Sequence, residues 1–126
     1  NACASATTAL LQALTTLNET LFVESAQALG RRMLSEGGKS EAERIAFGFR
    51  LCTSRSPSDD ERDELIGLLA KAHQRIADGW ISPWQIATGK EAKPADLPAG
   101  VTPADAGAYV VVARVLLNLD ETITKE

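Results

Sequence analysis

Apolar residues recur along most of the chain at the three- and four-residue spacing of helices that bury one face. Residues 7–17 place leucines at this spacing, and residues 20–36 continue with a similar apolar face. Asn18 and Thr20 interrupt the pattern, and we expect one of them to cap a second helix. Alternatively, the two segments run on as one bent helix. The glycine pair at 37–38 ends this part of the chain.

Two capping boxes predict the next two helices. The first is Ser-Glu-Ala-Glu at residues 40–43, and the second is Ser-Asp-Asp-Glu at residues 58–61, whose acidic first turn suits the helix dipole. The helix after the first box has a buried stripe of Ile45, Phe49 and Cys52. The helix after the second box carries Leu65, Leu68, Leu69, Ala72 and Ile76, and it ends near Asp78 and Gly79.

The most apolar stretch, residues 103–122, lies near the end of the chain, with Thr102 as its expected cap. Between Ala106 and Leu119 the only polar side chains are Arg114 and Asn118. A helix that is apolar over roughly three quarters of its circumference must be covered on several sides. We therefore expect it to be the central helix of a bundle. The following side chains should be nearly inaccessible to water: Tyr109, Val112, Ala113, Leu116 and Leu117.

These segments predict an all-α fold, a compact bundle of about five helices around the apolar C-terminal helix 103–122. No segment alternates with a period of two, so we expect no sheet. At 126 residues, with 44% hydrophobic and 24% charged residues, the chain has the composition of one globular domain. We assign that domain to residues 3–126 and interpret residues 1–2 as the remnant of a purification tag, on an excised part of a longer protein.

The irregular part of the chain, residues 79–102, contains both tryptophans. We expect a short helical turn after Ser82 that carries Trp84, followed by a polar, proline-rich crossing loop. Trp80 and Trp84 have two interpretations. They plug the end of the bundle, or they contact another domain or a ligand.

Charge and composition exclude several classes of partner. The net charge is -4 without a basic run, which disfavours nucleic acid and anionic membrane surfaces. Aromatic residues make up 5% of the chain, which argues against a stacking platform for bases or sugars.

The candidate chemistry is sparse, and we predict no catalytic residue, cofactor site or metal site. His73, the only histidine, lies at the edge of an apolar face without ligands at metal-binding spacing, so we interpret it as a boundary residue. The acidic cluster at 59–64 lies on a helix start rather than a calcium loop. Cys3 and Cys52 either form one bridge, if the N-terminus folds back, or remain thiols. No Cys-x-x-Cys-His haem motif is present.

Arg114 and Asn118, one turn apart, are the polar positions of the apolar helix. They could receive an anionic ligand or contact a partner. The alternative is a solvent-facing stripe or an internal pair with a carboxylate, such as Glu19 or Glu121.

Three segments resemble the motifs of one family. Residues 11–18, LQALTTLN, resemble a PLQALTLLND motif; residues 42–61 resemble an ERI…FRLALGRPPTxxE stretch; and residues 115–125 resemble a closing LLNLDETLTK. They are similar to the C-terminal domain of unknown function in large secreted planctomycete proteins, which often carry cytochrome-c-like domains upstream. Departures occur at helix boundaries, where Leu10 replaces a proline and Ser54 replaces a glycine.

This resemblance implies a multidomain, exported parent protein of the cell envelope or periplasm, with this domain at its C-terminus. It implies no established activity, and any haem belongs to another domain. The expected role is a non-catalytic structural or interaction module whose partner is the rest of its own chain. The alternative is an accessory domain that acts on envelope polysaccharide through the Trp80 and Trp84 loop.

Overall fold

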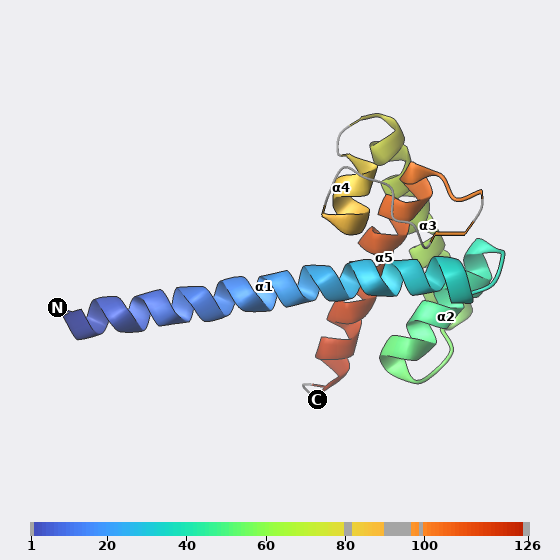
Figure 1. Ribbon diagram of the computed structural model, residues 1–126. Helices are drawn as coiled ribbons and strands as arrows, with labels where there is room; N and C mark the ends of the chain where they lie inside the picture. Colours follow the sequence, from blue (N-terminus) through green and yellow to red (C-terminus); the bar gives the residue numbers. More distant parts are fainter. Residues whose placement is uncertain (1, 80–81, 90–96, 99, 125–126) are drawn as a thin grey trace.

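The computed structural model contains five helices in the residues that it describes, and these cross one another at the end of the molecule remote from the N-terminus (Figure 1). It describes residues 2–79, 82–89, 97–98 and 100–124, with the side chains of 6–119 in these ranges. The helices are α1 (Ala2–Glu36), α2 (Glu41–Thr53), α3 (Asp59–Ala77), α4 (Pro83–Thr88) and α5 (Pro103–Thr124). The described residues contain no strand, and the predicted all-α class is confirmed.

Helix α5 is the central helix, as predicted, because it packs against each of the other four described helices. Tyr109, Val112, Ala113 and Leu116 are at most 2% exposed, as the apolar pattern predicts. Leu117 is only half-buried, so its predicted inaccessibility is wrong. The reason is thinner cover toward the C-terminal end of α5, where Leu119 is also exposed.

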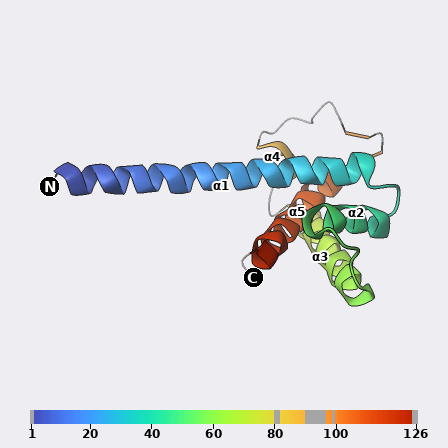
Figure 2. The ribbon, with the colours of Figure 1, turned by 90° about the horizontal axis from the view of Figure 1, so that it is seen from below.

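Helix α1 is continuous, so the expected break near Asn18 is wrong. The alternative, that the two segments run on as one helix, is confirmed, but the helix shows no bend (Figures 1 and 2). The threonine side chains in this region explain how the helix continues. The Thr20 hydroxyl donates to the Thr16 carbonyl at 2.9 Å, and Thr15 donates to Leu11 at 3.0 Å. In both bonds the hydroxyl donates to the carbonyl one turn earlier in the same helix. These threonines therefore fit within α1, and no second helix begins here.

The predicted caps of α2 and α3 are present. The Ser40 hydroxyl accepts from the Glu43 amide, and Ser58 and Glu61 form a reciprocal capping box. Glu61 also pairs with both terminal nitrogens of Arg55 at 2.9 Å. The Arg55 guanidinium, followed by the Ser58 amide, lowers the pKa of Glu61 to about 2. This network lies at the surface and sets the turn between the two helices.

The short helix α4 closes one side of the bundle. The buried Gln27 side chain of α1 donates to the Ile86 carbonyl of α4 at 3.2 Å, which ties the two helices together. Trp84 is half-buried and packs against the core. The glycine after α4, Gly89, has a φ of 75° and ends the helix.

Helices α1 and α5 cross in close contact at Gly30. A Cβ at this position would lie 2.9 Å from Val110 Cγ2 and 3.2 Å from Val110 Cα. The first distance is shorter than carbon atoms tolerate. The second is tight, and it involves backbone that cannot rotate away.

We therefore expect Gly30→Ala to lower the free energy of unfolding by about 1–3 kcal/mol, the range of overpacked cores. Gly67→Ala is the matched control, because Gly67 lies in the interior of α3 with nothing within 4 Å of its added Cβ. It should raise stability by about 0.5–1 kcal/mol through helix propensity. Urea unfolding followed by circular dichroism measures both, and equal effects of the two substitutions would contradict the close crossing.

Ser54 ends α2 in the left-handed region, with a φ of 63°. It is the only non-glycine residue with positive φ in the described part of the chain. A side chain in this conformation costs about 1–2 kcal/mol, which glycine avoids. We expect Ser54→Gly to stabilise the domain by about 1 kcal/mol and Ser56→Gly, two residues on, to destabilise it slightly. Thermal melts test the pair, and a loss of stability in Ser54→Gly would show that the serine side chain is needed at this cap.

Candidate functional site

The N-terminal half of α1 carries an exposed row of leucines that we call the leucine face. It consists of Leu10, Leu11, Leu14, Leu17 and Leu21. Four of these residues follow one another at spacings of four, three and four, so they share one side of the helix, and Leu11 flanks them. Their exposed fractions run from 48% to 61%. Sequence analysis predicted an amphipathic helix here, but its apolar side is not buried in the bundle.

The geometry of α1 explains this exposure. Burial in α1 begins at Ala26 and continues through Leu29, Met33 and Leu34. Near Phe22 the helix is still in contact with Arg114 of α5. Toward the N-terminus from there it projects beyond the other helices (Figures 1 and 2). The leucine face spans about 16 Å along the helix, at 1.5 Å per residue.

The projecting half of α1 is also without charge. Residues 2–18 contain no Asp, Glu, Lys or Arg, and Glu19 is the first charged residue of the chain. Half of the polar residues between the leucines are threonines, two of which bond back to the helix. A partner that covers the leucine face therefore has few ionised groups to desolvate, which is characteristic of the core of an interface.

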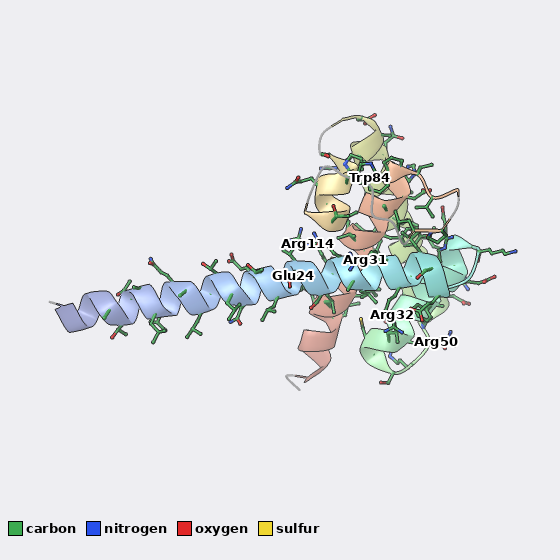
Figure 3. The ribbon with its side chains drawn as sticks, in the orientation of Figure 1. Glu24, Arg31, Arg32, Arg50, Trp84 and Arg114 are labelled. Carbon is green, nitrogen blue, oxygen red and sulfur yellow. The ribbon has the colours of Figure 1, made fainter. Side chains whose placement is uncertain are left out.

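Of the four residues expected at a partner contact, the structure describes Trp84, Arg114 and Asn118, which lie on two different helices. Arg114 and Asn118 are exposed on α5, on its outward side as expected. The Arg114 guanidinium lies 5.9 Å from the ring centre of Phe22 on α1, a cation–π contact. Figure 3 shows Arg114 near the crossing of α1 and α5 and Trp84 on α4. Trp80 lies outside the described residues.

His73 has a partner that the sequence did not reveal. Its Nε2 lies 2.9 Å from Oδ1 of Asp105, which is 32 residues away on α5. The other carboxylate oxygen of Asp105 accepts from the Thr102 amide at 3.1 Å, and Thr102 accepts from the Asp105 amide in return. His73 and Asp105 belong to different helices, so no spacing rule could have found the pair. It links α3 to the first turn of α5.

The other expectations concern acids, cysteines and membranes. Arg62 lies within salt-bridge distance of Asp59 and Asp63, so the acidic cluster is partly paired along α3. No group of His, Cys, Asp and Glu in the described residues is arranged to hold a metal ion.

Cys52 is half-buried on α2, whereas the side chain of Cys3 lies outside the described residues. Within the same residues, no helix has the length and apolar character needed to span a bilayer.

The His73–Asp105 pair predicts a stability that depends on pH. Partial burial acts to raise the pKa of Asp105, but the hydrogen bonds of Thr102 and His73 outweigh it and hold the pKa below its ordinary value. The unfolded chain has the ordinary value of about 3.9. The carboxylate therefore stabilises the fold above pH about 4, and this contribution is lost as the pH falls through the lower, folded pKa.

We expect Asp105→Asn to be less stable than wild type at neutral pH, by about 1 kcal/mol or less. The difference should shrink as the pH falls from about 5 to 3, because protonation removes the same interaction from wild type. Denaturant unfolding at a series of pH values measures this. The control is Asp60→Asn on α3, whose free energy of unfolding should depend on pH as that of wild type does. A difference in unfolding free energy between Asp105→Asn and wild type that stayed constant with pH would contradict the prediction.

Comparisons with known proteins bear on most of the helical body. A family model described as PSD1, protein of unknown function (DUF1553), matches residues 2–69, which include α1, α2 and the first half of α3. Neither the curated proteins nor the solved structures gave a match. Since the matched residues make up more than half of the 126, the chain belongs to the PSD1 (DUF1553) family of proteins of unknown function.

Proposed function

We propose that this domain is a non-catalytic structural and interaction module at the C-terminus of a multidomain exported protein. The leucine face of α1 is its docking surface, and its partner is another part of the same chain. One observation carries the proposal. Five leucines on a projecting helix are about half exposed, although each would be stabilised by roughly 1.5–3 kcal/mol if fully buried.

The form of the surface supports a protein partner. A row of leucines at alternating spacings of four and three is the pattern by which one helix packs against another. Contiguous exposed apolar surface of this kind marks interaction sites in soluble proteins. The C-terminal half of α1 is anchored in the bundle, so the continuous helix presents the leucine face in a defined direction.

The choice of partner rests on the family resemblance. Planctomycete proteins with similar motifs are large and secreted, often with cytochrome-c-like domains upstream, and their location implies an extracytoplasmic setting. In such a chain an upstream domain is tethered close to α1, which raises its effective concentration and favours docking within the molecule.

The alternative, polysaccharide recognition through Trp80 and Trp84, has no comparable support. Trp84 packs half-buried against the core, as a side chain that closes the bundle does. Tryptophan fluorescence in the presence of envelope glycans separates the two roles. We expect the emission to stay unchanged.

Substitutions on the leucine face test the proposal in the full-length parent protein. We expect residues 6–21 to be protected from hydrogen exchange there and to exchange faster in the double variant Leu14→Lys, Leu17→Lys. Closing the interface would then require two lysines to be desolvated. The interface should therefore be open at least about tenfold more often, and the amides should exchange correspondingly faster. The matched control is Gln12→Lys, Thr16→Lys, which adds the same charge to the other side of the helix and should leave protection unchanged.

Two results would contradict this proposal. One is equal exchange of residues 6–21 in the parent protein and in the isolated 126-residue chain. The other is protection that increases with protein concentration, because the leucine face would then pair with a second copy.

A further inference from the structure

A cavity of about 470 Å³ opens where the start of α2, the middle of α3 and the first turns of α5 meet. These elements lie at the end of the molecule remote from the projecting half of α1 (Figures 1 and 2). The cavity is lined chiefly by polar and charged side chains, among them Lys39, Glu41, Arg44, His73, Asp105 and Tyr109. Its volume lies in the range of small-molecule sites. We call it the Arg44 pocket.

Arg44 is held in place by two contacts. Its Nε donates to the Gly38 carbonyl at 3.1 Å, and its guanidinium carbon lies 5.5 Å from the centre of the Tyr109 ring. Its two terminal nitrogens have no ion pair with any described carboxylate. A guanidinium fork that is fixed by its Nε and stacked on a ring presents two parallel donors, which match the two oxygens of a carboxylate.

His73 lies on another wall of the pocket, and Asp105 determines which of its nitrogens is available. Both oxygens of Asp105 are already engaged, one by His73 Nε2 and the other by the Thr102 amide. The ionised Asp105 can only accept a hydrogen bond, so Nε2 carries the proton, and in a neutral imidazole Nδ1 then remains as an acceptor. Asp105 therefore orients His73, and the ring can accept a hydrogen bond from a ligand hydroxyl.

Tyr109 adds an unsatisfied polar group to the pocket. The residue is 2% exposed, and no described group meets its hydroxyl in hydrogen-bond geometry, although the Arg44 guanidinium lies close enough to act on it. Burial raises the pKa of this phenol, which keeps it protonated, while the nearby Arg44 opposes the shift. A buried hydroxyl without a partner is uncommon in native proteins, where such groups are bonded to protein, water or ligand.

The charge balance narrows the class of ligand. Lys39 and Arg44 are positive and Glu41 and Asp105 are negative, so the charges of these four side chains cancel. Such a site has little long-range attraction for a doubly charged phosphate, but it keeps the short-range geometry of the guanidinium fork. A ligand with one carboxylate and several hydroxyls satisfies both conditions.

We propose that the Arg44 pocket binds a small hydroxy-carboxylate of about the size of a hexuronic acid. Arg44 holds the carboxylate through its two terminal nitrogens, with the Tyr109 hydroxyl beside it. His73 and Glu41 accept hydrogen bonds from the hydroxyls of the ligand. The site lies away from the leucine face, so it stands independently of the proposed docking function.

The experiment is a titration of the ¹⁵N-labelled 126-residue chain with sodium glucuronate, followed by NMR chemical shifts. We expect saturable shifts at the amides of residues 38–44, 69–74 and 105–109, with a Kd on the order of 1 mM. Arg44→Gln and Arg44→Lys should each weaken binding about tenfold or more, because neither offers the guanidinium fork. Arg50→Gln is the matched control on the same helix, exposed and remote from the pocket (Figure 3), and should bind as wild type does.

Further ligands define the specificity. Glucose lacks the carboxylate and should produce no saturable shift, whereas acetate lacks the hydroxyls and should bind more weakly than glucuronate. Inorganic phosphate should also bind more weakly. The proposal is overturned if glucuronate gives no saturable shift, if phosphate binds more tightly than glucuronate, or if folded Arg44→Lys, judged by its spectrum, binds as tightly as wild type.

Discussion

The crossing of α1 over α5 is the contact on which the other features of the molecule depend. Gly30 has no side chain at the crossing, so α1 lies directly on the backbone of Val110. This contact brings Ala26 and Met33 of α1 into full burial beside the central helix. Other glycines act in the same way, since Gly48 of α2 lies against Met33 and Leu116, and Gly107 of α5 lies against α3 and α4. The bundle is therefore assembled through close helix contacts at small residues.

The position of that crossing divides α1 into two halves with different roles. The half from Ala26 onward belongs to the core, whereas the leucine face lies beyond the reach of the other helices. An isolated helical segment of this length is marginal in water. Its continuity with the anchored half supports it, and burial of the leucine face on a partner would stabilise it further. The crossing of α1 over α5 therefore has two effects. It anchors the helix, and it leaves the leucine face outside the bundle.

The opposite end of the bundle is organised by polar contacts. Asp105 receives a bond from Thr102 at the start of α5 and another from His73 of α3, so a single carboxylate joins a helix cap to an interhelical contact. The same arrangement orients His73 toward the Arg44 pocket. Ring contacts to arginine occur throughout the molecule, including Arg44 over Tyr109 and Arg55 over Phe49. They let long charged side chains cover apolar surface while their ends remain available.

The helical class, the caps at Ser40, Ser58 and Thr102, and the burial of most of α5 could be predicted from the sequence, because they follow from local hydrogen bonding and periodicity. Whether an apolar face is covered depends instead on how the helices pack. The leucines at positions 10–21 have the periodicity of a buried face, yet no other helix reaches them. The packing of the helices also decides which distant side chains meet. His73 and Asp105, or Arg44 and Tyr109, are neighbours only because α2, α3 and α5 converge, and no local pattern encodes that convergence.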